Sequence, residues 1–269
     1  MFLTKGGLPL SPLWERFFKG HKGHYSIYIH SLPSYRANFH PGSVFYKRQI
    51  PSQATRWGRV SICDAERRLL ANALLDISNQ RFVLLSESCI PLHNFTFIHN
   101  YITNSKYSFV NPFDDPGPHG RGRYNTSMSP VINATQWRKG SQWFEVDRSL
   151  ALRIVGDTKF YPRFAKSCRP PCYADEHYFP TMLSIEVGNS LANRSVTWVD
   201  WSRGGPHPGT FGGADITRGF LKRVYGKTCS YNDRFSSVCY LFVCYLFGRK
   251  FSPSALEALF FIGPKFLGY

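Results

Sequence analysis

Acidic residues are scarce in this sequence of 269 residues: 17 Asp and Glu stand against 33 Lys and Arg, which gives a net charge of +16. Such an excess favours an anionic partner, whether a nucleic acid, an acidic membrane surface or a small phosphorylated ligand. Heptads, zinc-finger spacings and an arginine-rich arm are also missing. A basic nucleic-acid-binding module is therefore the least favoured of three functional hypotheses, and we expect no nucleic-acid partner. The hydrophobic fraction of 43% excludes disorder as the default and allows one large domain or two small ones.

Long apolar runs are missing as well. No stretch of 18 apolar residues occurs, and the first ten residues (MFLTKGGLPL) resemble neither a signal peptide nor a membrane span. The chain nevertheless carries four N-x-[ST] sequons, at Asn94, Asn125, Asn133 and Asn193. Because such sites are glycosylated on exposed loops in the secretory pathway, four of them together indicate an oxidising lumen.

The seven cysteines fit that compartment. Cys168 lies close in sequence to Cys172, and Cys229 to Cys239, so either pair can form a disulfide. The odd count has a local explanation: residues 238–247 (VCYLFVCYLF) are a tandem duplication of five residues. Either Cys244 or Cys239 is therefore an extra copy.

Hydrophobic patterning predicts alternating strands and helices, which is typical of an α/β fold. The strongest helical pattern begins at Ser61 and continues to Ile77, with Asp64 positioned to complete a cap. Residues 111–125 are rich in Gly and Pro and predict a long functional or mobile loop. The remaining expected elements are strands at Tyr25–His30, Val44–Tyr46 and Arg81–Leu85, and a last helix that opens at Ser252-Pro253 and stops at Gly263-Pro264.

Two short polar stretches are candidates for chemistry. Ser86-Glu87-Ser88 follows the strand at Arg81–Leu85, and ligands of open α/β sheets bind at the carboxyl ends of strands. The second stretch is Asp175-Glu176-His177, which could be a metal site, a general base with its support, or the polar start of a helix. Adjacent residues on a helix point about 100° apart, so the two carboxylates cannot both face one pocket. His177 lacks the i, i+4 spacing of helical zinc ligands.

Several stretches, in order along essentially the whole chain, resemble the plant branch of the core-2/I-branching β-1,6-N-acetylglucosaminyltransferase family (glycosyltransferase family 14-like). They are FLTKG, LPLSPLWERFF, YSIYIHS, DAERRLLANAL, FVLLSESCIPL, WRKGSQWFEV, CYADEHYFPTML, VTWVDWSRGG and CYLFGRKF. The resemblance implies a GT-A type nucleotide-sugar fold with a Rossmann-like N-terminal half. It also implies that an N-terminal anchor, a stem and the start of the first strand are absent, because family members carry these before FLTKG.

The same resemblance implies a single catalytic domain over residues 1–269, with a nucleotide-sugar-binding half at 1–110 and an acceptor-binding and catalytic half at 111–269. The implied activity is inverting, metal-independent transfer of a sugar, N-acetylglucosamine in the family, from a UDP-sugar to a hydroxyl of a glycan or glycoprotein. The implied location is the lumenal side of the Golgi membrane, with membrane contact only through the anchor. The duplication and the missing strand leave an alternative: an inactive carbohydrate- or nucleotide-binding relic.

Metal independence can be examined from the residues. Many GT-A enzymes hold a divalent cation with an Asp-x-Asp motif, and no Asp-x-Asp occurs in this sequence. Ser86-Glu87-Ser88 stands at the corresponding strand end and is a poor ligand set for a hard cation. The pairs Glu145-x-Asp147 and Asp64-x-Glu66 are expected to be solvated. We therefore expect no metal and no cofactor, with basic side chains stabilising the leaving diphosphate.

Residue roles follow from matched motifs. Glu176 corresponds to the family's catalytic base, and Asp175 is expected to satisfy backbone N–H groups at the helix start. A neighbouring carboxylate and partial burial are expected to raise the pKa of Glu176 from its reference value. Lys250, with Arg249, corresponds to the position that contacts the UDP diphosphate, and Ser86 and Glu87 are expected beside the donor.

Other positions are less directly matched. The partner arginine of the family falls among Arg223, Lys227 and Arg234, with no decisive match, and Arg223 is our candidate. Gly226-Lys227-Thr228 does not end a P-loop, because Leu221 occupies the place of its first Gly. For the acceptor we expect the rings of Trp143 and Trp201 to contact sugar, since polar or Gly residues lie close to both.

Overall fold

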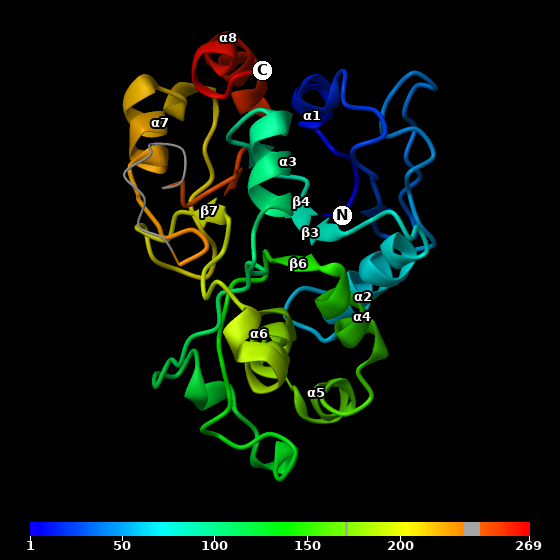
Figure 1. Cartoon of the computed structure of the whole chain (residues 1–269), viewed down its shortest axis with the longest axis vertical. Helices are drawn as coiled ribbons and strands as arrows, with labels where there is room; N and C mark the ends of the chain where they lie inside the picture. Colours follow the sequence, from blue (N-terminus) through cyan, green and yellow to red (C-terminus); the bar gives the residue numbers. More distant parts are fainter. Residues whose placement is uncertain (170–171, 234–242) are drawn as a thin grey trace.

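The structure, a computed structural model, describes residues 1–169, 172–233 and 243–269. In this part of the chain, short strands lie near the middle of the molecule and helices lie on either side of them (Figure 1). The helices are α1 (Ser11–Phe18), α2 (Ser61–Leu74), α3 (Phe95–Thr103), α4 (Arg148–Gly156), α5 (Tyr161–Ser167), α6 (Ala174–Val187), α7 (Arg218–Tyr225) and α8 (Leu256–Phe266). The strands are β1 (Phe2–Leu3), β2 (Ile29–His30), β3 (Arg81–Val83), β4 (Leu85–Ser86), β5 (Ile90–Pro91), β6 (Glu145–Asp147), β7 (Thr197–Val199) and β8 (Phe247–Arg249).

The described strands form three small sheets. In the first, β1 pairs in parallel with both β2 and β4. In the second, β3 pairs antiparallel with β6. In the third, β8 pairs in parallel with β7 and antiparallel with β5. This is a mixed α/β architecture, consistent with the GT-A type fold of the family that the sequence resembles.

The predicted strand at Arg81–Leu85 is split between two sheets. Residues Arg81–Val83 pair with β6, whereas Leu85 and Ser86 pair with β1. Its side chains also alternate between two hydrophobic clusters, because successive residues of an extended chain point to opposite faces. Leu84 belongs to the cluster that contains α2, α4 and α6, and Leu85 belongs to the cluster that contains α1, α3 and α8.

These two clusters divide the chain in an interleaved way. The first, here called the upper core, takes its buried residues from 2–45, 85–109 and 196–267. The second, the lower core, takes them from 50–84 and 110–191, together with Met1. The expected boundary at residue 110 therefore does not separate two cores.

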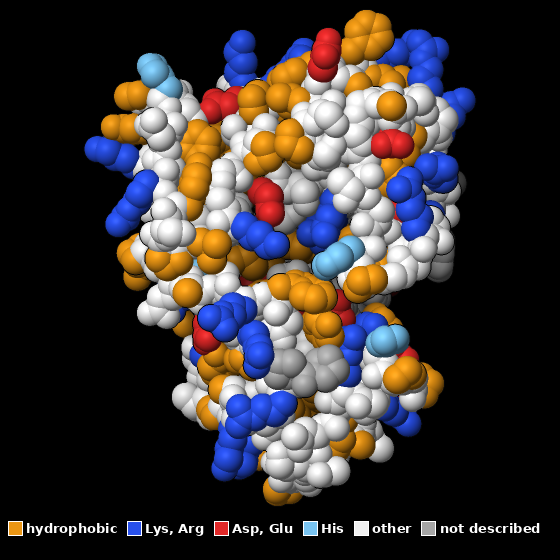
Figure 2. Space-filling view, turned by 180° about the vertical axis from the view of Figure 1, so that it is seen from behind, with side chains coloured by type: hydrophobic (Ala, Val, Ile, Leu, Met, Phe, Trp, Pro, Cys, Tyr) orange, Lys and Arg blue, Asp and Glu red, His pale blue; other side chains and the backbone are white. Residues whose placement is uncertain are grey.

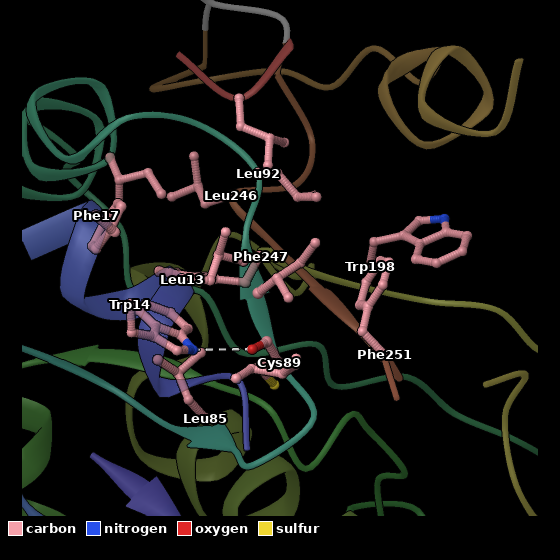
Figure 3. Packing of buried hydrophobic residues seen from close by; sticks show 14 of the residues in the cluster. Leu13, Trp14, Phe17, Leu85, Cys89, Leu92, Trp198, Leu246, Phe247 and Phe251 are labelled. Atoms are coloured by element: carbon pink, nitrogen blue, oxygen red, sulfur yellow. Dashed lines mark hydrogen bonds between the residues drawn. The ribbon is translucent and has the colours of Figure 1, made fainter. Parts of the chain in front are cut away.

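Aromatic side chains fill the upper core (Figure 3). Trp14 of α1 stacks against Phe247 of β8, and its indole N–H donates to the carbonyl of Cys89 at 3.1 Å. Phe2 meets Trp14 edge-to-face at a centroid distance of 5.2 Å. A buried Trp with its N–H satisfied is a stable anchor, so the loop after β4 is held firmly where it approaches β8.

Three expectations about secondary structure are wrong. Residues 44–46 form turns, in which the amide of Tyr46 donates to the carbonyl of Ser43, and no strand forms there. Ser61 does not cap α2; its hydroxyl accepts from the amide of Arg56 at 3.0 Å. The last helix continues past Gly263-Pro264 to Phe266, because a proline near the end of a helix removes only one N–H donor from the last turn.

Cys168 and Cys172 form the disulfide that their spacing predicts. The expected pairing of Cys229 with Cys239 is wrong: Cys229 is bonded to Cys244, with 5.1 Å between their Cα atoms. Cys239, and with it the first copy of the duplication at 238–242, lies outside the described residues. Across the described ranges, no helix has both the length and the apolar character that crossing a membrane requires.

Candidate active site

The carboxyl ends of β4 and β8 lie side by side. The amide of Phe251, just after β8, donates to the carbonyl of Ser88, just after β4, at 2.9 Å. This bond brings Ser86-Glu87-Ser88 next to Arg249 and Lys250, as the sequence predicts for a donor site. Ser86 is buried, and its hydroxyl contacts Ser88 Oγ and Cys89 Sγ within the loop, whereas Glu87 is partly exposed.

Positive charge gathers at this edge of the sheet. Lys250 is half-buried, and its pKa is lowered from the usual value by burial, by Arg249 and by Lys5, whereas Glu87 acts in the opposite direction. The sequence reasoning missed Lys5, although it belongs to the FLTKG stretch that carries the resemblance. Because β1 and β4 are parallel neighbours, the chain that follows β1, with Lys5 as its second residue, leaves the sheet at the same edge as Glu87.

Arg249 covers a face of Trp143. The guanidinium carbon lies 4.1 Å from the centre of the indole ring, and only 6% of Trp143 is exposed. The expectation that Trp143 stacks on an acceptor sugar does not hold in this structure, because its ring is buried beneath the arginine. Trp201, by contrast, is 52% exposed and remains available to a ligand.

The start of α6 separates the three polar side chains of Asp175-Glu176-His177. Glu176 keeps 29% of its side chain exposed, and its Oε2 lies 3.2 Å from Nη1 of Arg123. His177 is buried, stacks on Trp137 at 4.6 Å and contacts the carbonyl of Arg138 through Nδ1. Asp175 is buried with its Oδ1 unpartnered, and it is not the cap that was expected, because Tyr173 holds the N-cap position of α6 and no side chain caps the helix. Only Glu176 therefore combines exposure with a charged partner.

Asp175 and Glu66 of α2 are both buried, and the charge of Asp175 acts on Glu66. Glu66 accepts a hydrogen bond from Gln142 through Oε1, while its Oε2 has no partner. Burial, and after it the charge of Asp175, raises the pKa of Glu66 well above its usual range. Burial and the charge of Glu176 raise the pKa of Asp175 to about 7. Both carboxyls are thus held where the protonated form is favoured.

The expectation that Asp64-x-Glu66 and Glu145-x-Asp147 are solvated pairs is wrong for both glutamates. Glu66 and Glu145 are fully buried. Glu145 lies 3.3 Å from Arg81 and accepts from the amide of Phe109, and burial raises its pKa to about 7. Asp147 accepts from the amide of Leu150 as the cap of α4. No group of three or more His, Cys, Asp or Glu side chains that could hold a metal occurs in the described ranges.

A four-residue segment connects the acidic and basic sides of the site. The amide of Gly140 donates to the carbonyl of Glu176 at 2.8 Å, and Trp143 lies under Arg249. Three Cα–Cα steps of 3.8 Å allow at most about 11 Å between Gly140 and Trp143. The segment Gly140–Trp143 therefore links the backbone of the candidate base to the Trp143 ring that Arg249 covers.

Arg223 of α7 lies at the far side of this edge. It lowers the pKa of Asp200, after the larger contribution of hydrogen bonds from Ser202. The carbonyl of Asp200 accepts from Gly209, whose own carbonyl accepts from the amide of Lys250. Arg223 thus acts by its charge on a residue whose backbone is connected to Lys250 through two hydrogen bonds. Arg234 lies outside the described residues.

The sequons differ in accessibility. Asn94, Asn133 and Asn193 are exposed, while Asn125 is half-buried and donates through Nδ2 to the carbonyl of Ser167. A pocket of about 380 Å³ lies away from the site, at the amino ends of β1 and β3, where it is lined by Met1, Tyr25 and Arg81 among others. It plays no part in the geometry described above.

Comparison with known proteins gives two matches. The family model of the Core-2/I-branching enzyme matches residues 1–225. The chain is also 36% identical to the rice (Oryza sativa subsp. japonica) protein named Glycosyltransferase BC10, over an alignment of 297 residues that covers 95% of this chain and 73% of that protein.

Proposed function

Because the chain belongs to the Core-2/I-branching enzyme family and is a glycosyltransferase, we propose that it moves a sugar, N-acetylglucosamine in the first instance, from a UDP-sugar to a hydroxyl of a glycan or glycoprotein. One observation carries the proposal. Glu176, a partly exposed carboxylate with a charged partner, is linked through Gly140–Trp143 to an edge that holds Arg249, Lys250 and Lys5. A base and a set of cations are what transfer with a diphosphate leaving group requires.

The chemistry assigned to these groups is a single displacement. The acceptor oxygen forms a bond to the anomeric carbon of the donor, while the bond from that carbon to the diphosphate oxygen breaks and its electron pair leaves with UDP. The acceptor proton passes to the carboxylate of Glu176. Attack on the face opposite the leaving group inverts the anomeric centre. Arg123, at 3.2 Å, holds the carboxylate in place.

The charge on the departing UDP falls to the basic edge. Lys250 lies within the electrostatic influence of Arg249, Glu87 and Lys5. A diphosphate bound there would gain two or more charge-assisted contacts. The donor set at this edge is basic rather than acidic, and this supports a reaction without a divalent metal. Ser86 and Glu87 would contact the sugar or its nucleotide from the β4 side.

The exposed sequons and the two disulfides support a lumenal site of action, and the Golgi is the compartment proposed. Trp201 is proposed as an acceptor contact because half of its surface is open to solvent.

The test is the pair Glu176→Gln and wild type, assayed for transfer from UDP-N-acetylglucosamine and for UDP affinity by calorimetry. Glu176→Gln should abolish transfer while UDP affinity and thermal stability stay unchanged, because the amide keeps the shape and loses the basicity. Unchanged turnover in the variant would remove Glu176 from the mechanism. The same assay in EDTA tests metal independence, and loss of activity that Mg²⁺ or Mn²⁺ restores would contradict it.

An inactive relic is the alternative. It is separated from the enzyme by pairing the calorimetric titration with the transfer assay, since a relic would show weak or no UDP binding and no turnover of any UDP-sugar.

A further inference from the structure

Three aromatic side chains from distant parts of the sequence meet next to Arg123, the partner of Glu176. Trp57, which precedes α2, lies 5.1 Å from the ring of Tyr173 and 5.0 Å from the ring of His207. We call Trp57, Tyr173 and His207 the aromatic ledge. Trp57 is 53% exposed, although Trp side chains are usually largely buried.

The backbone at the ledge is specialised to bring these rings together. Tyr173 adopts a left-handed conformation with φ of +51°, which is unfavourable for a residue with a bulky side chain. Gly58 has φ of +72°, and a Cβ at this position would lie 3.3 Å from the Tyr173 ring. The chain therefore uses a glycine and a strained tyrosine to place Tyr173 against Trp57.

The ledge touches both sides of the reaction. The guanidinium carbon of Arg123 lies 4.3 Å from the centre of the Tyr173 ring, and the same arginine pairs with Glu176. At the other end, His207 is two residues before Gly209, whose carbonyl accepts from the amide of Lys250. The ledge thus runs from the proposed base to the proposed donor edge.

We propose that the aromatic ledge binds a neutral pyranose ring of the acceptor glycan, with the ring stacked on Trp57 so that a hydroxyl reaches Glu176. This inference rests on the proposed function and adds the acceptor subsite to it. The apolar face of a sugar ring matches an exposed aromatic face, and hydroxyls at its rim can bond to water or to Arg123. The acceptor fits better than the donor because the half-open side of Trp57 faces solvent, while the donor phosphates belong at the half-buried Lys250.

Figure 2 shows a narrow region between the upper and lower parts of the molecule, where hydrophobic side chains lie next to a histidine. Above this region, basic side chains lie next to an acidic one. A ligand bound across this narrow region would contact both an apolar and a charged surface.

The test compares wild type, Trp57→Ala and Trp57→Tyr, with Phe261→Ala as a control, because Phe261 is 91% exposed on α8 and outside the ledge. Saturation-transfer NMR with cellobiose and N,N′-diacetylchitobiose as neutral probes reports ring stacking directly. Trp57→Ala should lose saturation of the probe, Trp57→Tyr should retain most of it, and Phe261→Ala should match wild type.

Kinetics give the second reading. Trp57→Ala should raise the KM for the acceptor by up to about tenfold, which is the loss expected from one aromatic stacking contact. Acceptor-free hydrolysis of the UDP-sugar and the KM for the donor should stay unchanged. If acceptor KM and probe saturation are unchanged in Trp57→Ala, or if wild type hydrolyses UDP-sugar yet saturates neither probe, the ledge is not the acceptor subsite. If wild type saturates the probes, Trp57→Ala does not, and wild type turns over no UDP-sugar, the proposed function fails while sugar binding at the ledge is confirmed.

Discussion

Asp175→Asn should stabilise the protein at neutral and alkaline pH and have almost no effect near pH 4. In the folded chain, burial followed by the charge of Glu176 raises the pKa of Asp175 from 3.8 to about 7. The folded state therefore binds a proton more tightly than the unfolded state, and the contribution of this group to stability decreases as pH rises from about 4 to 7. Above pH 7 both states are ionised, and the contribution is constant.

At pH 8 this pKa difference lowers the free energy of unfolding by at most about 4 kcal/mol, because each tenfold change in the acid dissociation constant is equivalent to about 1.36 kcal/mol. Asparagine is neutral at every pH and therefore removes this penalty. The free energy of unfolding of Asp175→Asn, minus that of wild type, should therefore rise with pH and become constant near pH 8.

Urea unfolding at several pH values between 4 and 8 measures this difference. Subtraction removes the contribution of Glu145, whereas the pKa of Glu66 is lowered in the variant because the charge of Asp175 is gone, and this adds to the stabilisation at high pH. Asp76→Asn is the control of opposite sign. Hydrogen bonds from Ser78 lower the pKa of Asp76, so this variant should be less stable than wild type at pH 7, and the difference should vanish as pH falls. A difference for Asp175→Asn that is flat with pH, or that favours wild type at pH 8, would refute the buried-acid reasoning.

Three further perturbations test the site and its scaffold. Lys250→Ala should lower kcat/KM for the UDP-sugar at least about a hundredfold, the size expected when a group that stabilises a leaving charge is lost, and Lys250→Arg should recover part of it; equal activity in all three proteins would exclude the role. Arg123→Ala should lower kcat about tenfold without changing UDP affinity, because the guanidinium holds Glu176 rather than the nucleotide, so a change confined to UDP affinity would contradict the assignment. Cys229→Ser and Cys244→Ser should each lower the free energy of unfolding by about 3 kcal/mol, as expected for a disulfide that closes a loop of about 15 residues. Cys239→Ser should leave the melting temperature unchanged. Loss of stability in Cys239→Ser but not in Cys244→Ser would instead support a disulfide between Cys229 and Cys239.

Much of the site could be predicted because its signals are local. The helical pattern after Ser61 appears as α2, and the strand end at Ser86-Glu87-Ser88 lies beside Lys250. The 100° rule for adjacent residues correctly separates Glu176 from Asp175 and His177.

What could not be predicted depends on contacts between distant segments. Glu66 lies on a helix whose pattern indicates a solvated face, yet α6 packs over it, so it is buried beside Asp175. Trp143 has polar neighbours in sequence, but Arg249, more than a hundred residues later, covers its ring. Cys239 and Cys244 have identical neighbours on either side, so spacing alone could not tell which of them reaches Cys229. Trp57 gave no motif signal, and only its contacts with Tyr173 and His207 single it out.

The interleaving of the two cores limits how this enzyme can be recombined with its relatives. A chimera joined once, at residue 110, would pair helices α4, α5 and α6 from one parent with α2 from another. The lower core would then combine side chains from two proteins that did not evolve to pack against each other. An exchange that respects the packing would instead transplant residues 50–84 and 110–191 together and keep the segments of the upper core from one parent. The lower core should therefore be exchanged as two segments transferred together.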